Sequence, residues 1–186
     1  MFDGDGAVLW QQATQDASSA VTGSAVYDFE GDGIADVVYA DEVNLYVYSG
    51  TDGAVKLLYD GHNSGTLIEY PIVVDVDNDG QVEIVVAHNN LLQTNYGVSV
   101  IGDKDKSWRP GRKIWNQHAY NITNVTDLGG IPSDYKSNWL GNNTFNSFRS
   151  GDAGQAPGEF YDLQAEIIGV CAVSYTHLRA HETDSY

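Results

Sequence analysis

The sequence has little positive charge, one cysteine and no long apolar run. Nine Lys and Arg residues stand against 26 Asp and Glu residues, for a formal net charge of −17 over 186 residues. Nucleic acid and anionic membranes are bound by basic surfaces, so this balance argues against both as partners. No stretch is long enough to span a bilayer, and we expect no membrane insertion within this segment. Cys171 does not decide the compartment, because a free buried thiol and half of a disulfide both fit.

Both ends of the sequence favour a fragment of a longer protein. Residues 1–6 read as the end of a strand entering a hairpin turn directly after Met1, and no signal peptide is visible. Residues 173–186 resemble the translation of a sequencing adaptor. We therefore expect an artefact tail there, and further N- and C-terminal regions of unknown identity beyond the segment.

What the sequence does contain is an internal repeat, set among 20 glycines and 12 tyrosines. Abundant glycine and tyrosine favour β-strands joined by tight turns. Asp28 matches Asp75 at an offset of 47 residues (75 − 28), and the neighbouring sequence keeps that offset. The matched segments are 5–8 with 52–55, 25–28 with 72–75, 32–33 with 79–80, and 36–40 with 83–87. A repeat of this period indicates one supersecondary unit used twice.

Each repeat unit is predicted to form four short strands, of which the first two are covered on both faces. The predicted strands are 25–27, 37–40, 45–48 and 54–59 in the first unit, and 72–74, 84–87 and 98–101 in the second. Asp52-Gly53 and the matching segment 3–6 are predicted to be turns. Four-stranded units of this period are typical of propeller blades. We predict an all-β partial β-propeller with blades of about 47 residues, and the alternatives are a β-sandwich and a solenoid.

An acidic loop joins the first and second strands of each unit, at residues 28–36 and 75–83. Carboxylates stand at loop positions 1, 3, 5 and 9, and a glycine at position 6 lets the backbone turn so that they converge. Calcium takes roughly six to eight oxygen ligands, and the backbone carbonyl at position 7 would add one more. The predicted ligands are Asp28, Glu30, Asp32, Ile34 and Asp36 in the first loop, and Asp75, Asp77, Asp79, Gln81 and Glu83 in the second. The sequence therefore predicts two calcium sites.

Two other interpretations of these loops are an EF-hand and an acidic turn without metal. An EF-hand requires flanking helices and a glutamate at position 12, where this chain has Tyr39 and Val86. A metal-free turn, built from aspartate side chains bonded to the backbone, stays as the alternative. Two copies with matched ligand positions favour calcium.

The loops resemble those of FG-GAP repeats, also called VCBS-type repeats, which occur in integrin α-subunit propellers and in bacterial surface proteins. The resemblance covers residues 1–108 and implies that the carboxylates at positions 1, 3, 5 and 9 of each loop bind calcium. Glu30 departs from the aspartate that is usual at position 3. The signatures that name the family are not clearly present, so the chain is more similar to the bacterial members.

An aromatic, asparagine-rich segment follows the repeats at residues 109–150. It could form a platform for a sugar, or it could be a cap whose aromatic side chains close the edge of the propeller. The residues available for a sugar platform are Trp108, Trp115, Trp139, Asn116, Gln117 and His118. Residues 151–158 read as a linker, and 159–172 resemble the start of an immunoglobulin-like domain.

These observations favour a calcium-binding, non-enzymatic module of a secreted or cell-surface bacterial protein, with a role in adhesion or in binding a ligand or matrix. Millimolar extracellular calcium would fill such sites. We assign no catalytic residue and no organic cofactor. The alternatives are a lectin-type glycan-binding propeller and a polysaccharide lyase, whose basic cluster would be Arg109, Arg112, Lys113 and His118. A glycan or an extracellular matrix protein is the expected partner.

Overall fold

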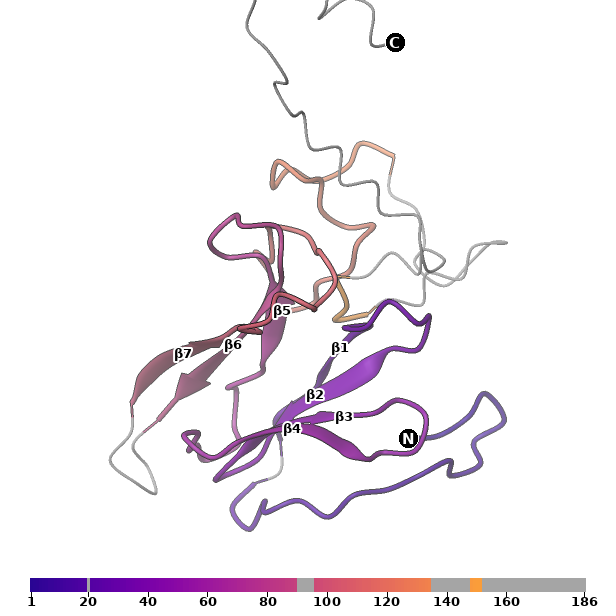
Figure 1. Ribbon diagram of the computed structural model, residues 1–186, viewed down its shortest axis with the longest axis vertical. Helices are drawn as coiled ribbons and strands as arrows, with labels where there is room; N and C mark the ends of the chain where they lie inside the picture. The colour runs from indigo at the N-terminus through magenta and orange to yellow at the C-terminus, as the bar shows by residue number, and fades with distance from the viewer. Residues whose placement is uncertain (20, 90–95, 135–147, 152–186) are drawn as a thin grey trace, which may run out of the picture.

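The computed structural model describes residues 1–19, 21–89, 96–134 and 148–151, and it contains two antiparallel β-sheets (Figure 1). The first sheet has the strand order β1-β2-β3-β4 and the second has the order β5-β6-β7. The strands are β1 (Ala25–Tyr27), β2 (Asp36–Ala40), β3 (Leu45–Tyr48), β4 (Val55–Tyr59), β5 (Ile72–Val74), β6 (Glu83–His88) and β7 (Gly97–Ile101). In the part of the chain that the structure describes, no helix has the length and apolarity needed to cross a membrane.

The all-β class and all seven predicted strands are confirmed, and no strand end moves by more than one residue. The two sheets also share their register. Val26 pairs with Val37 across β1 and β2, and Val73 pairs with Ile84 across β5 and β6. Both residues of the second pair lie 47 positions after those of the first. The repeat in the sequence is therefore a repeat in the structure.

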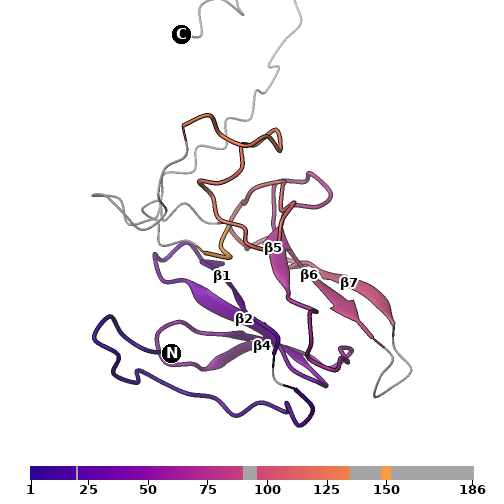
Figure 2. The same cartoon turned by 180° about the vertical axis from the view of Figure 1, so that it is seen from behind.

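The hydrophobic core takes side chains from both sheets, and the first strands β1 and β5 contact each other (Figure 2). Alternate, mostly β-branched side chains of the strands point into it, as a half-covered sheet requires. Each acidic loop adds one apolar residue, Phe29 in the first and Val82 in the second, and both are buried. The loops are thus anchored to the core by side chains that lie between their acidic residues.

The two faces of the first sheet are covered unequally, which differs from the prediction that its first two strands are buried on both sides. Val37 and Tyr39 are only half-buried, because their face packs against the N-terminal segment rather than against another sheet. The Tyr39 hydroxyl donates to Asp16 Oδ2 at 2.8 Å, and the rings of Trp10 and Tyr48 lie 6.1 Å apart. A groove of about 410 Å³ remains between this segment and the sheet.

Aspartate side chains close the two predicted turns. Asp3 Oδ1 accepts hydrogen bonds from the N–H groups of Asp5 at 3.0 Å and Ala7 at 2.8 Å. Asp52 Oδ1 accepts one from the Ala54 N–H at 3.0 Å. Both carboxylates are used by the backbone, as in other aspartate turns, and the prediction of turns is confirmed.

The chain after β7 crosses both repeat units. The Tyr27 hydroxyl donates to the Pro110 carbonyl at 2.6 Å, and the Asp75 N–H donates to the Arg112 carbonyl at 3.0 Å. The predictions made for Trp139, for the domain start at 159–172 and for the tail at 173–186 lie outside the described residues, as do residues 152–158 of the linker predicted at 151–158.

Arg149 ties the beginnings of β1 and β5 together. Its guanidinium donates to the carbonyl oxygens of Ser24 at 3.0 Å, Pro71 at 2.7 Å and His118 at 2.8 Å. Its own carbonyl accepts a hydrogen bond from the Val26 N–H at 3.1 Å. Arg149 is 5% exposed, so these charge-assisted bonds are shielded from water.

Candidate metal centre

The second acidic loop, residues 75–83, is shaped by the carboxylate of Asp75. Its oxygens accept hydrogen bonds from the N–H groups of Asn78 at 2.8 Å and Gly80 at 3.2 Å. These bonds draw the chain back over the end of β5. Asn78 and Gly80 have φ values of 65° and 93°, a region that asparagine and glycine tolerate best. The turn predicted at the position-6 glycine is present.

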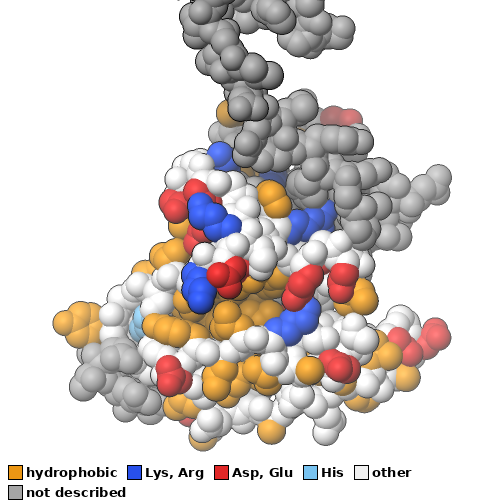
Figure 3. Space-filling view, viewed as in Figure 1, with side chains coloured by type: hydrophobic (Ala, Val, Ile, Leu, Met, Phe, Trp, Pro, Cys, Tyr) orange, Lys and Arg blue, Asp and Glu red, His pale blue; other side chains and the backbone are white. Residues whose placement is uncertain are grey.

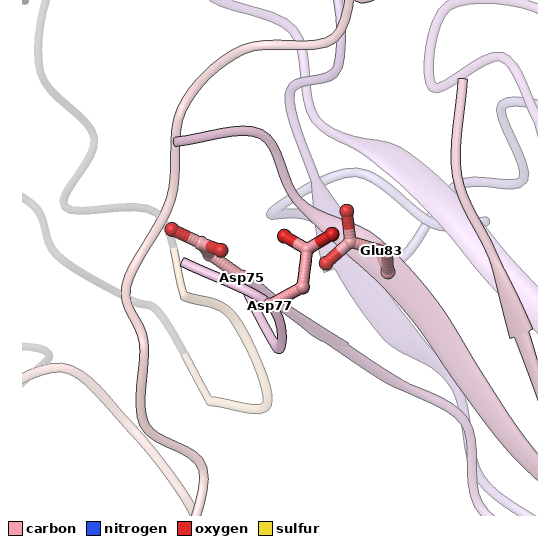
Figure 4. Close-up of side chains that lie close together, drawn as sticks. All are labelled: Asp75, Asp77 and Glu83. Atoms are coloured by element: carbon pink, nitrogen blue, oxygen red, sulfur yellow. The ribbon is translucent and has the colours of Figure 1, made fainter. Parts of the chain in front are cut away.

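Three of the four predicted carboxylates of the second loop come together. Asp75, Asp77 and Glu83 each offer an oxygen, and these atoms lie within 4.8 Å of one another (Figure 4). Asp75 and Glu83 are 1% and 8% exposed, whereas Asp77 is open to solvent. The arrangement is a half-buried cup of carboxylate oxygens, which are the donors that calcium prefers. We call Asp75, Asp77 and Glu83 the acidic triad.

The acidic triad carries an excess of negative charge. Burial and the negative charges of Asp77, Asp75 and Asp79 raise the pKa of Glu83. A hydrogen bond from the Val76 N–H works in the opposite direction and is outweighed. Among the described residues no basic group bonds to Asp77 or Glu83, and Lys113 Nζ lies 3.9 Å from Asp75 Oδ2. A divalent cation in the cup would relieve the repulsion between these carboxylates.

The fourth predicted carboxylate, Asp79, is directed elsewhere. Its Oδ2 accepts a hydrogen bond from Lys106 Nζ at 2.6 Å, and this exposed partner lowers the pKa of Asp79. Its Oδ1 accepts from the Gln81 N–H at 2.9 Å. Asp79 does not join the acidic triad. Asp79 and the carbonyl of Gln81 are therefore still only predicted as ligands.

The first acidic loop, residues 28–36, has nearly the same backbone shape. Asp28, 2% exposed, accepts hydrogen bonds from the N–H groups of Gly31 at 2.7 Å, Asp32 at 3.0 Å and Gly33 at 2.9 Å. Gly31 and Gly33 have φ values of 73° and 86°. Position 1 thus organises both loops in the same way, through its carboxylate and the N–H groups of the turn.

The first loop differs in what its carboxylates contact. Lys56 Nζ, from β4, lies 2.8 Å from Glu30 Oε2 and 2.8 Å from Asp36 Oδ1. Arg109 Nη1 lies 3.1 Å from Asp28 Oδ2, and both of these side chains are buried. Among the described residues, the acidic triad of the second loop is the one group of carboxylates gathered closely enough to hold a metal. The first loop has basic side chains in that place.

Lys56 also sets the protonation of the first loop. Burial works to lower the pKa of Lys56, but its hydrogen bonds with Asp36 and Glu30 outweigh this and raise it. Burial likewise works to raise the pKa of Glu30, but the hydrogen bond from Lys56 and one shared with Asp36 outweigh it, and the pKa is lowered. Burial raises the pKa of Asp36 to about 6, against the attraction of Lys56. Lys56 is therefore a charged partner at neutral pH.

A cavity of about 260 Å³ adjoins this ion pair. Its lining combines the charged side chains of the first loop with apolar ones from both units, including Phe29, Glu30, Asp36, Lys56 and Trp108. On the face of the molecule drawn in Figure 3, hydrophobic side chains gather in the middle and charged side chains of both signs surround them. Lys56 and Glu30 are partly exposed to solvent beside this cavity, whereas Asp36 is buried.

Sequence reasoning missed Lys56 and Arg109, the two cations of the first loop. Lys56 lies 26 residues from Glu30 in the chain, and Arg109 lies 81 residues from Asp28. The repeat gave no signal for Lys56, because the 47-residue offset holds only through the second strand of each unit. Val38 pairs with Val47 and Val85 pairs with Val100, so the offset at the third strand is 53 residues (100 − 47). In the described residues the second sheet also lacks a fourth strand that could supply a lysine.

The comparisons agree with this geometry. Residues 28–86, which contain both acidic loops, match the family model for the FG-GAP-like repeat. No curated protein sequence matches the chain. The crystal structure of the V. cholerae biofilm matrix protein Bap1 is similar, with a TM-score of 0.72 and 33% sequence identity over 81% of this chain. The match spans a quarter of that protein, 25% of its length. Residues 28–86, with both acidic loops, are therefore FG-GAP-like repeat sequence, and the fold is similar to part of a biofilm matrix protein.

Proposed function

We propose that this chain is a calcium-stabilised, non-enzymatic propeller segment of an extracellular bacterial protein that contributes to a matrix or to adhesion. The observation that carries the proposal is the acidic triad, Asp75, Asp77 and Glu83, which lies in an FG-GAP-like repeat. The likeness to a biofilm matrix protein favours the extracellular location and the matrix role. The two sheets would be neighbouring blades, with β1 and β5 as their innermost strands.

Calcium has a structural role in this proposal. It would bind between the loop after β5 and the first residue of β6, because Asp75 and Asp77 lie in the loop and Glu83 begins the strand. The ion would tie two neighbouring strands together and offset the repulsion of three carboxylates. Such a site requires no catalytic group, and the weak binding typical of extracellular modules is sufficient at millimolar calcium.

The aromatic segment supports the capping interpretation more than a sugar platform. Trp108 and Trp115 pack against the hydrophobic core, and Trp115 stacks on the buried Tyr120 with ring centroids 4.3 Å apart. A stacking platform for a sugar needs an aromatic face open to solvent. We therefore place ligand binding second to the structural role of this segment.

Thermal unfolding of the full chain tests the proposal. In millimolar calcium the melting temperature should exceed that in a chelator by roughly 5–10 °C, as expected for a ligand near 100 times its dissociation constant. Asp77→Asn should abolish this increase, since it removes a triad carboxylate that is open to solvent. The matched control is Asp60→Asn, an exposed aspartate outside both loops, which should keep the increase. A wild-type melting temperature that is the same in calcium and in a chelator would contradict the proposal.

A further inference from the structure

We infer that the first acidic loop holds no calcium, because Lys56 occupies the place of the ion as a cation built into the chain. The inference goes beyond the proposed function, which concerns the second loop, and it narrows the two predicted calcium sites to one. It rests on the positions of Lys56 and Arg109 relative to the predicted ligands. It also rests on the second loop, where no side chain that the structure describes places such a cation between the matching carboxylates.

The first argument is position. Lys56 Nζ lies 2.8 Å from an oxygen of Glu30 and 2.8 Å from an oxygen of Asp36, which are loop positions 3 and 9. Calcium binds oxygen at about 2.3–2.6 Å, so an ion between these two carboxylates would overlap the ammonium group. In the second loop, positions 3 and 9 are Asp77 and Glu83, and no basic side chain among the described residues bonds to either.

The second argument is the commitment of position 1. The Arg109 guanidinium lies 3.1 Å from Asp28 Oδ2, and the side chains of Arg109 and Asp28 are 7% and 3% exposed. The backbone N–H of Arg109 also donates to the Phe29 carbonyl at 2.8 Å, which holds the residue against the loop. Three of the four predicted carboxylates of this loop therefore already contact a basic side chain.

The third argument is that Lys56 belongs to the sheet that carries the loop. It lies on β4, the fourth strand of that sheet, at a β-bulge between Val55, which pairs with Tyr48, and Leu57, which pairs with Val47. A bulge re-aims the side chain of the extra residue. A cation that is part of the fold has a high effective concentration at the site, and its ordering is completed on folding. Free calcium has to displace it and also leave Lys56 without its two partners. The lysines that contact the second loop, Lys106 and Lys113, compete less strongly with calcium, because their side chains are 65% and 56% exposed.

Counting bound calcium on the full chain tests the inference. By isothermal titration with calcium chloride, the wild type should bind one ion per chain, and Lys56→Gln should bind two. Lys56→Gln keeps the stem of the side chain and removes the charge, so Glu30 and Asp36 become available. The control Lys104→Gln removes an exposed lysine outside the loops and should leave one ion. Two ions in the wild type, or one ion in a folded Lys56→Gln variant, would overturn the inference.

A second set of variants keeps the two proposals apart. In the wild-type background, Asp36→Asn should leave the calcium titration unchanged, whereas Asp77→Asn should remove all binding. This pair shows which loop binds calcium in the wild type, even when the Lys56 variant does not fold. In the Lys56→Gln background, Asp77→Asn should leave one ion, now in the first loop. No calcium binding by the wild type would end the proposed function. The inference would survive that result if Lys56→Gln gained one ion, and it would fail if the variant gained none.

Discussion

The two acidic loops have nearly the same backbone and different electrostatics. In each, the position-1 aspartate binds the N–H groups of the turn, and glycines adopt positive φ. In the first, Lys56 bridges the carboxylates at positions 3 and 9, whereas the matching carboxylates of the second have no such partner among the described residues. The loop sequence therefore determines the shape of the turn. A residue from outside the loop determines whether a basic side chain neutralises the loop carboxylates.

Anchoring differs between the loops as well. Phe29 at position 2 of the first loop is 2% exposed, and its ring lies 4.7 Å from Trp108. Val76 at the same position of the second loop is 45% exposed, and Val82 at position 8 is the buried residue instead. The first loop thus depends on a buried aromatic and an ion pair. The second depends on a smaller apolar contact and, in our proposal, on calcium.

The largest expected effect on stability is the difference between substitutions at position 2 of the two loops. Phe29→Ala should lower the free energy of unfolding by about 3–5 kcal/mol, because it removes a buried aromatic side chain and leaves a cavity. Val76→Ala, at the matching position of the second loop, should change it by less than about 0.5 kcal/mol, as is usual at exposed sites. Urea unfolding of both variants in a chelator measures the difference. Equal losses would show that the loops are anchored alike.

A second test concerns His62, which lies between β4 and β5, and His88, the last residue of β6; their Nδ1 atoms are 3.1 Å apart. Burial, followed by the charge of His88, lowers the pKa of His62 to about 4. The unfolded value is about 6.5, so the unfolded chain binds more protons between these values. Stability should fall as the pH drops from about 6.5 to 4, by an amount on the order of 3 kcal/mol. Above about pH 6.5, His62 should make no contribution to the change of stability with pH.

Urea unfolding at several pH values, in a chelator, measures this dependence. His62→Gln should flatten the slope between pH 6.5 and 4.5, whereas His118→Gln, at an exposed histidine, should retain it. Because the pair lies outside both acidic loops, neither variant should alter the number of calcium ions bound. A His62→Gln variant with the wild-type slope would show that other groups carry the acid sensitivity.

The third comparison removes the internal cation. Lys56→Met, assayed in a chelator, should lower the free energy of unfolding by roughly 2 kcal/mol, because the buried Asp36 loses a charged partner. Glu30 is half exposed and contributes less, since water screens it. Adding calcium should restore much of the loss, if the freed loop binds the ion. The readout is the urea midpoint with and without calcium, and a loss that calcium leaves unchanged would contradict the expectation.

The smallest effect is expected for Lys106→Gln. Its ion pair with Asp79, at 2.6 Å, is exposed on both sides, and exposed pairs add little to stability. The melting temperature in a chelator should stay within experimental error of the wild type. A drop comparable to that of Lys56→Met would show that the second loop also relies on a lysine, and the contrast between the loops would disappear.

Much of this arrangement could be predicted from the sequence because it depends on residues that are close in the chain. The strands follow from apolar runs, the turns at Asp3 and Asp52 from local aspartate chemistry, and the shape of the loops from a carboxylate and a glycine five positions later. The pairing of Lys56 with Asp36 and of Arg109 with Asp28 could not be predicted. These contacts depend on how β4 and the segment after β7 fold back onto the first loop, and no local pattern encodes that return.

The contacts of Arg149 have a consequence for how the protein forms during synthesis. Its guanidinium binds carbonyl oxygens that precede β1 and β5, one of them 125 residues earlier in the chain. The two sheets can pair their own strands as they leave the ribosome, since their hairpins are local. The edge where β1 and β5 meet lacks these hydrogen bonds until Arg149 has been made. A chain interrupted before Arg149 would expose that edge, with unbonded carbonyls and open strands, to other chains.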